Sequence, residues 1–461
     1  MTKYKGLAFI NTIGCQMNVY DSEKLAGILN SYGFEKTQDM DEADIVVCNT
    51  CSIRHKAEEK AFSFLGRFAR EKTRRPHLIT VMAGCVAQQE GKKAFDRLPH
   101  LNLVLGTQAF SRFGAHIDAL KSGTQRIVDI EESDMIFEAL PDETCFEENK
   151  VSRFVTIMQG CDNFCTYCVV PYVRGRERSR APEAILEEIR ILARNGIKEV
   201  TLLGQNVNSY GIREQGLSFP GLLEKVSRIE GIKRIRFATS HPKDLSEELI
   251  HAVRDIDKVC RHVHLPVQSG SDKILKKMNR GYTRETYLSR IRALREACPD
   301  IGLSTDIIVG FPFETKEDFH LTLDLIQEAR FDSIFAFAYS DRSSAPAAKF
   351  SSQVEETEKK DRLNQLLELQ ETLTEKKNRA EIGQTLGVLV EGFSAKERDG
   401  FVKPSAKTRQ MTGRTESNKI VHFASDGIKI GDLVDIKIEK TYPHSLWGTS
   451  AADQCWERKI K

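Results

Sequence analysis

Three cysteines stand close together in the segment GCDNFCTYC, at Cys161, Cys165 and Cys168. Thiolates at such spacings bind metal, but a closed zinc site needs four ligands, and no fourth cysteine or histidine follows nearby. A [4Fe–4S] cluster held by only three thiolates leaves one iron free to take a small molecule. The spacing therefore indicates an iron–sulfur site with an open position. A zinc site completed by a distant histidine or cysteine is the alternative.

The first of these cysteines directly follows a strand-like segment, SRFVTIMQG, which ends at Gly160. Five similar segments follow, alternating with helical stretches: EVTLLGQN, IRFATSHP, HVHLPVQSGS, LSTDIIVGFP and SIFAFAYSD. The first helical stretch begins at Pro182, which suits a first turn, and is followed by Gly196 at the place of a C-terminal cap. Six strand–helix units in a row predict a partial barrel of parallel strands, with chemistry at the carboxyl ends of the strands.

The C-x3-C-x2-C spacing, with Tyr167 before the last cysteine and a six-unit series behind it, resembles the radical S-adenosylmethionine superfamily. The resemblance implies that the open iron chelates S-adenosylmethionine, whose reductive cleavage yields a 5′-deoxyadenosyl radical. By resemblance and by position at strand ends, we predict cofactor contacts from Gly204, Gln205 and Gly310, with Tyr167 beside the adenine. Gly204 and Gly310 are equally well explained as turn glycines.

Three further cysteines share one position in a second strand–helix pattern, which runs from residue 3 to about residue 122. This alternation predicts a doubly wound parallel sheet. Cys15, Cys51 and Cys85 each end a predicted strand. The carboxyl ends of parallel strands gather along one edge of a sheet, where ligands bind, so we expect the three thiols to converge there.

Cys48 lies three residues before Cys51, and the two could form a redox dithiol. Three residues along a strand span roughly 10 Å, however, so we expect Cys48 to lie inside the sheet layer as a buried core residue. We expect the remaining isolated cysteines to be structural or incidental; they are Cys145, Cys260, Cys298 and Cys455.

The segments TIGCQMNVYDSEKLAGIL, NTCSIRHKAEEKAFSFLG and AGCVAQQEG are similar to the three cysteine motifs of the radical S-adenosylmethionine methylthiotransferase family. The resemblance implies that Cys15, Cys51 and Cys85 hold an auxiliary [4Fe–4S] cluster, again with an open iron. It also implies two uses of S-adenosylmethionine: one molecule methylates a sulfur at the auxiliary cluster, and the other is cleaved at the cluster of Cys161, Cys165 and Cys168.

After a charged helix predicted at 353–380, residues 383–450 alternate in short segments that predict a small antiparallel β-barrel. Basic residues outnumber acidic ones there, which suits contact with an RNA backbone, although solvated surface charge is the alternative. GRTESNKIVHF and SLWG resemble the TRAM domain, an RNA-binding barrel. We predict RNA contacts at Lys403, Lys407, Arg409 and Arg414, with Phe393, Phe401 and Tyr442 as possible stacking partners.

Length, net charge and cysteine count limit the class of protein that this chain can be. The 461 residues exceed what one core usually supports, and we place domains at 3–122, 147–380 and 383–450, with a linker at 123–146. A net charge of +2 means that nucleic-acid binding must rest on a local basic surface. No apolar run approaches the length of a membrane span, and the strand-like pattern near the first residue leaves no room for a signal peptide. Eleven cysteines are an odd number and are sparse in a chain of this length, which does not fit a secreted disulfide framework. We expect a cytoplasmic protein without membrane contact.

Four segments separate the branches of the methylthiotransferase family: GCQMNVYDSE, CVVPYVRGRERSR, TLLGQNVNSYG and ATSHP are similar to the branch that makes 2-methylthio-N6-isopentenyladenosine in tRNA. Gln16 and Met17 stand where the branches acting on a ribosomal protein or on threonylcarbamoyl-adenosine carry other residues. The resemblance implies a transferase that adds a methylthio group to C2 of N6-isopentenyladenosine just 3′ of the anticodon, using two clusters and two S-adenosylmethionine molecules. The implied partners are this tRNA, an electron donor and a sulfur source, and we expect a monomer.

Two alternatives remain at this stage. The chain could methylthiolate another tRNA adenosine or a protein, or it could be an RNA-binding or sensory protein whose clusters are structural. One segment also departs from the family: YSDRSSAPAAK has Ser343 and Ser344 where Pro-Gly usually follows the arginine. This substitution puts the conformation of that loop, and any cofactor contact it makes, in question.

Overall fold

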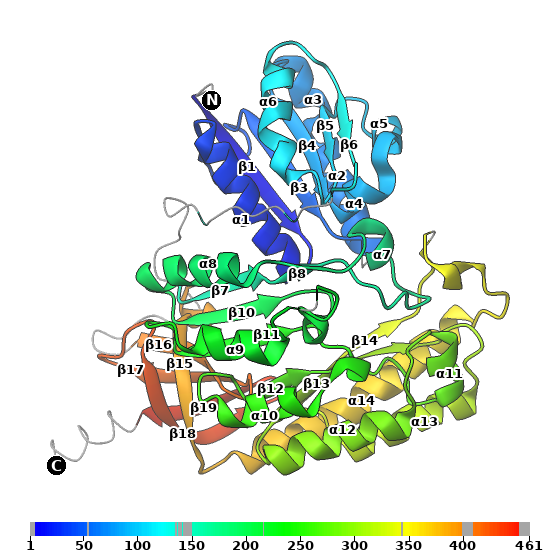
Figure 1. Ribbon diagram of the computed structural model, residues 1–461, viewed down its shortest axis with the longest axis vertical. Helices are drawn as coiled ribbons and strands as arrows, with labels where there is room; N and C mark the ends of the chain where they lie inside the picture. Colours follow the sequence, from blue (N-terminus) through cyan, green and yellow to red (C-terminus); the bar gives the residue numbers. More distant parts are fainter. Residues whose placement is uncertain are drawn as a thin grey trace.

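In the computed structural model, the chain forms three units that follow one another along the sequence (Figure 1). The structure describes residues 5–52, 55–133, 136, 141, 150–214, 216–342, 344–398 and 409–450. Figure 1 shows the first unit, in blue and cyan, above a central green and yellow array, with the third unit, in orange and red, at its lower left. Along these described ranges, no helix combines the length and apolar character needed to cross a membrane.

The first unit is a parallel sheet with helices on both faces, in the strand order β2-β1-β3-β4-β5-β6. Its strands are β1 (Gly6–Ile13), β2 (Phe34–Lys36), β3 (Ile45–Thr50), β4 (Ile79–Gly84), β5 (Leu103–Leu105) and β6 (Ile127–Asp129). Its helices are α1 (Gln16–Ser31), α2 (His55–Gly66), α3 (Phe68–Arg74), α4 (Cys85–Glu90), α5 (Ala94–Arg97) and α6 (Phe113–Lys121). The predicted doubly wound sheet is confirmed.

The strand IVVCNT explains why both faces of this sheet are covered. Successive side chains of a strand point to opposite faces. Ile45 and Val47 of β3 accordingly pack on the side of α1 and α6, whereas Val46 and Cys48 pack on the side of α2 to α5. A strand that is apolar on both faces is stable only where helices bury both, as in parallel sheets.

The central unit consists of two three-stranded parallel sheets, ordered β7-β10-β11 and β12-β13-β14. These strands are β7 (Ser152–Thr156), β10 (Glu199–Leu203), β11 (Arg234–Ala238), β12 (His262–His264), β13 (Gly302–Val309) and β14 (Ser333–Ala338). A bridge between Ile235 and Val259 links the two sheets. All six predicted strands are present, and together they form the expected partial barrel around one core.

Helices cover the outside of this partial barrel (Figure 1). They are α8 (Pro182–Arg194), α9 (Phe219–Ser227), α10 (Glu247–Asp255), α11 (Asp272–Lys277), α12 (Arg284–Ala297), α13 (Lys316–Ala329) and α14 (Glu356–Ala380). A short helix and hairpin surround the cysteine loop: α7 (Val170–Val173), β8 (Met158–Gln159) and β9 (Arg178–Ser179). The charged helix predicted at 353–380 is α14, whose Leu366 is fully buried against the core.

The third unit is a closed barrel in the order β15-β16-β17-β19-β18. Its strands are β15 (Thr385–Phe393), β16 (Arg409–Thr415), β17 (Ile420–Ser425), β18 (Leu433–Tyr442) and β19 (Ser445–Ser450), with the short helix α15 (Ala395–Arg398) after β15. Neighbouring strands are antiparallel except β17 and β19, which pair in parallel. The parallel pair has a simple cause, because strand direction cannot alternate all the way around a closed ring with an odd number of strands.

Two arginines of β11 dock this barrel onto the central unit. Arg234 Nη1 donates to the backbone oxygen of Arg414 at 2.5 Å, and Arg236 Nη2 donates to that of Thr415 at 2.7 Å. Arg236 is also paired with Glu199 at 2.9 Å. Burying a guanidinium is costly unless most of its donors find partners, and these bonds supply such partners on the barrel, so they favour one orientation of it.

Candidate functional site

The structure brings Cys15, Cys51 and Cys85 together, and we call them the N-terminal triad. Cys51 and Cys85 directly follow β3 and β4, and Cys15 comes two residues after the end of β1; these three strands are neighbours in the sheet. A side-chain hydrogen bond with Cys51 is the main cause that lowers the pKa of Cys15 to about 6, against the opposing effect of burial. Cys85 interacts electrostatically with Cys15. The sheet order reverses between β1 and β3, which is the place where such sheets bind ligands.

Asn18 holds the loops of this triad in place. Its Oδ1 accepts from the backbone nitrogen of Cys15 at 3.2 Å, and its Nδ2 donates to the backbone oxygen of Thr50 at 3.1 Å. Gly84 has a φ of 91°, and a side chain there would collide with the backbone of Thr50. Asn18 was not predicted from the sequence; its place three residues after Cys15, where a capping box puts its second residue, was the local signal, whereas its partner Thr50 lies on β3.

Cys48 lies in the core, as predicted, rather than with Cys51. It is fully buried among Val46, Met82 and Phe62, and burial raises the pKa of its thiol. Of the other isolated cysteines, Cys260 and Cys298 are buried, whereas Cys145 and Cys455 lie outside the described residues.

The second group, Cys161, Cys165 and Cys168, lies in the loop between β8 and α7, and we call it the loop triad. Its members interact electrostatically with one another, and burial raises the pKa of Cys161 to about 11 and that of Cys168 to about 12. Buried thiols of this kind stay protonated until a metal binds and replaces the protons. Gly160 precedes the loop with a φ of 81°, where a side chain would collide with the backbone of Arg176.

A buried arginine stands beside the loop triad. Arg280 Nη1 donates to Cys165 Sγ at 3.3 Å and to the hydroxyl oxygen of Tyr167 at 3.2 Å, while Nη2 donates to the backbone oxygen of Pro266 at 2.7 Å. A guanidinium at this distance stabilises a thiolate. Arg280 was not predicted, because a single arginine in MNRGYT shows no spacing that points to a distant cysteine.

The structure shows which local contacts surround the residues predicted to bind the cofactor. Gln205 Oε1 accepts from the backbone nitrogen of Gly160 at 2.5 Å, so it borders the loop triad. A side chain at Gly204 would collide with Met158, and Gly310 has a φ of 68° with Lys359 close by. These packing reasons support the alternative that both are turn glycines, and their contact with S-adenosylmethionine stays a prediction.

The loop YSDRSSAPAAK lies between the two triads. The backbone nitrogen of Ala347 donates to the oxygen of Thr166 in the loop triad at 2.9 Å. On its other side, Ala345 shares a buried cluster with Cys85 of the N-terminal triad. Ser343 lies outside the described residues. The loop is therefore an element that contacts both groups of cysteines.

The chemistry of the donors fits iron–sulfur clusters. Each triad is a set of three thiols, the first at the ends of three strands and the second within one loop, and each has a buried guanidinium beside it, Arg174 in one case and Arg280 in the other. Within the described residues, no three His, Cys, Asp or Glu side chains are arranged to hold a single metal ion. A four-iron cube is larger than one ion, so its thiolates stand farther apart than ligands that share an ion.

Only some of the residues predicted to contact RNA lie within the described part of the third unit. Arg409 is exposed and lies over the ring of Phe393, 3.7 Å from its centroid. Arg414 is paired with Glu391 at 3.1 Å, which offsets its charge. Tyr442 is exposed. Lys403, Lys407 and Phe401 lie outside the described residues.

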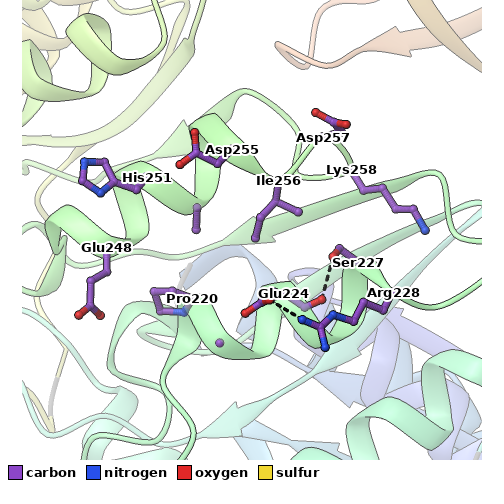
Figure 2. A pocket seen from close by; sticks show the side chains of 12 residues that line it. Pro220, Glu224, Ser227, Arg228, Glu248, His251, Asp255, Ile256, Asp257 and Lys258 are labelled. Carbon is purple, nitrogen blue, oxygen red and sulfur yellow. Dashed lines mark hydrogen bonds and ion pairs between the residues drawn. The ribbon is translucent and has the colours of Figure 1, made fainter.

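A groove on the outer surface, between α9 and α10, is separate from these groups (Figure 2). None of the predicted site residues lines it. Figure 2 shows Arg228 and Glu224 turned toward each other across one turn of α9, where they form an ion pair of 2.5 Å. Arg228 and Glu224 thus offset each other's charge at the end of α9, as is common for i,i+4 pairs on solvated helix surfaces.

Family models match all three units of the chain. They are the radical SAM superfamily at residues 155–326, the uncharacterized protein family UPF0004 at residues 7–106 and the TRAM domain at residues 379–450. Among solved structures, the radical S-adenosylmethionine methyltransferase TsrM from Kitasatospora setae superposes with a TM-score of 0.57 at 14% identity, over 74% of this chain and 75% of that one. This likeness concerns the fold alone.

Curated relatives match nearly the whole length. A protein from Desulfosudis oleivorans named tRNA-2-methylthio-N(6)-dimethylallyladenosine synthase is 52% identical, over 95% of this chain and 96% of its own. A protein of the same name from Geobacter metallireducens is 48% identical, over 97% of this chain and 99% of its own. The chain therefore belongs to the radical S-adenosylmethionine family of tRNA-2-methylthio-N(6)-dimethylallyladenosine synthases.

Proposed function

We propose that this chain is a tRNA-modifying transferase that adds a methylthio group to C2 of N6-isopentenyladenosine next to the anticodon. The observation that carries the proposal is the presence of two separate groups of three thiols, one at the carboxyl ends of three parallel strands and the other in the loop between β8 and α7, in units that touch each other. Three thiolates per cluster leave one iron of each cube open to a ligand. A methylthiotransferase needs two such positions, one for S-adenosylmethionine and one for sulfur.

In this proposal the loop triad and the N-terminal triad each hold one [4Fe–4S] cluster, and two S-adenosylmethionine molecules are used. When bound, the clusters and S-adenosylmethionine supply one-electron chemistry and a sulfur donor, which acid–base side chains cannot provide. Arg280 donates to Cys165 Sγ and would stabilise its thiolate in the cluster, and Tyr167, which also accepts from Arg280, would stand beside the adenine of the cofactor. Gln205 keeps the loop triad against the end of β10, which Gly204 directly follows, and Gly310 stands at the end of β13 in the other sheet.

The RNA reaches the site as a single-stranded anticodon loop. A base that is to react must leave its stack, and a loop makes this step inexpensive. The third unit contributes charge through Arg409, Lys403 and Lys407, whereas Glu391 offsets the charge of Arg414. Arg409 lies over the ring of Phe393, so this pair offers an aromatic surface together with positive charge.

The remaining partners follow from the chemistry. Reductive cleavage requires an electron donor, and each turnover consumes one sulfur atom that a sulfur source must replace. We propose that the chain acts as a monomer in the cytoplasm, where its tRNA substrate is found.

The proposal is tested by anaerobic reconstitution followed by turnover. We expect about eight irons per chain, since two cubes carry four irons each. With dithionite and S-adenosylmethionine, 5′-deoxyadenosine should form, and mass spectrometry of digested tRNA should detect the 2-methylthio-N6-isopentenyl nucleoside. The matched control is the same tRNA without the isopentenyl group, which should stay unmodified.

Four irons per chain, or no cleavage of S-adenosylmethionine, would contradict the enzyme assignment. Equal modification of the tRNAs with and without the isopentenyl group would support methylthiotransferase activity but refute N6-isopentenyladenosine as its specific substrate.

A further inference from the structure

Arg174 reaches the N-terminal triad from the central unit. It follows α7, six residues after Cys168 of the loop triad, and it is buried. Its Nη2 donates to Oδ2 of Asp21 at 2.6 Å, and Asp21 lies on α1, the helix that begins directly after Cys15. The charge of Arg174 acts on both Cys15 and Cys85. One short helix therefore connects the loop triad to the thiols of the other unit.

Both units fix the position of this helix. Val169, directly before α7, and Val173 at the end of α7 share a buried cluster with Cys85. From the first unit, Thr107 Oγ1 donates to the backbone oxygen of Val173 at 2.6 Å, and Gln108 Nε2 donates to that of Arg174 at 3.2 Å. Arg174 therefore has little freedom to move away from the N-terminal triad.

Arg342 approaches the same triad from a different loop. It belongs to YSDRSSAPAAK, and its charge acts on Cys51 and on Glu58 of α2. The backbone nitrogen of Ala345 donates to the oxygen of Arg342 at 2.8 Å, which forms a turn, and Ala345 itself packs in the cluster that contains Cys85. Two loops of the central unit thus bring guanidinium groups to thiols that all belong to the first unit.

We propose that Arg174 and Arg342 are positioning residues for the sulfur-carrying centre, whose negative charge they offset across the interface between the two units. Three thiolates and an anionic sulfur ligand concentrate negative charge in a place with little water, where charges interact strongly. Arginine is charged at any working pH, so the compensation is permanent. The N-terminal triad is then complete only when the central unit is docked. This inference rests on the proposed function, because it requires a cluster on that triad.

The test isolates the auxiliary centre in the full-length chain. A reference variant carries Cys161→Ala, Cys165→Ala and Cys168→Ala, so that only the N-terminal triad can bind a cluster. Arg174→Gln, Arg342→Gln, their Lys counterparts and Asp21→Asn are each added to it. Iron per chain and the midpoint potential are measured by anaerobic titration followed by electron paramagnetic resonance. Arg190→Gln serves as a control, because this arginine is half exposed and pairs only with Glu187 on its own helix among the described contacts.

Reduction adds an electron, and a nearby positive charge favours it. We expect both Gln substitutions to shift the midpoint potential downward or to lower the iron content, with the Lys counterparts closer to the reference. Asp21→Asn should shift the potential upward, because it removes a negative charge and leaves Arg174 in place. Arg190→Gln should leave it unchanged.

The inference is overturned if both Gln variants keep the iron and the potential of the reference, or if the Lys variants lose the iron as completely as the Gln variants. A reference variant that binds no iron would instead refute the proposed function, because the N-terminal triad would then hold no cluster.

Discussion

Lys24 on α1 and Glu188 on α8 form a buried ion pair of 2.9 Å between the first and the central unit. The other oxygen of Glu188 accepts from Arg180 at 2.7 Å and from the hydroxyl of Tyr20 at 3.2 Å. A buried carboxylate needs this many partners, because transfer of a charge out of water costs several kcal/mol. The network therefore selects one placement of the units, and with it the relation between the two triads.

Glu188→Gln should destabilise the protein by about 3–5 kcal/mol, because it leaves the charges of Lys24 and Arg180 buried without a counterion. The free energy of unfolding, measured in denaturant, checks this expectation. The matched control is Glu187→Gln on the same helix, where the carboxylate is exposed and pairs only with surface arginines among the described contacts. Its unfolding midpoint should not change. An equal loss of unfolding free energy in both variants would show that burial of the Glu188 network does not raise the cost of removing the carboxylate.

Cys51 and Cys48 provide a matched pair three residues apart. Cys51→Ala should lower the iron content of reconstituted protein by about four per chain, because it removes one of three thiolates of a cube. It should leave reductive formation of 5′-deoxyadenosine in place, since the loop triad is intact.

Cys48→Ala should keep the full iron content, because this thiol is buried in the core. Iron and sulfide analysis of both variants checks the prediction. Iron loss in the Cys48 variant, with none in the Cys51 variant, would show that the two roles had been exchanged.

Glu177 makes stability depend on pH. Burial raises the pKa of its carboxyl group from an ordinary 4.5 to about 7. Between these two values the folded protein binds this proton more strongly than the unfolded chain does, so stability decreases as pH rises through the window.

Glu177→Gln removes the titration while it keeps the shape of the side chain. The variant should therefore gain stability relative to the natural protein on going from pH 5 to pH 8, as measured by thermal unfolding at each pH. A constant difference between the two proteins across this range would contradict the prediction.

Arg409 should contribute to tRNA binding through its charge and through its stack on Phe393. Arg409→Ala should weaken binding of every tRNA and reduce the slope of log affinity against log salt by about one, as expected for a single phosphate contact.

Filter binding over a salt series measures this slope. Arg228→Ala removes the same charge from the groove of Figure 2, where Glu224 pairs with it, and should leave the slope unchanged. Identical slopes for the Arg409 variant and the unsubstituted protein would exclude Arg409 from the RNA surface.

The sequence by itself determined the elements and the approximate place of the thiols. Cys161, Cys165 and Cys168 are neighbours along the chain, so their spacing is informative before any folding is considered. Cys15, Cys51 and Cys85 are far apart, but strand–helix alternation implies parallel strands, whose carboxyl ends must share one edge. The period of a strand also placed Cys48 correctly in the core.

Only the tertiary structure decided what surrounds these thiols. Arg174, Arg280 and Arg342 meet their cysteines through loops that belong to other parts of the chain, and no local pattern marks such a partner. The parallel pair of β17 and β19 could not be predicted from alternating segments either, because it follows from the closure of the ring. Charge pairs such as Lys24 with Glu188 form only when whole units dock, since burial of each charge depends on surfaces that both units contribute.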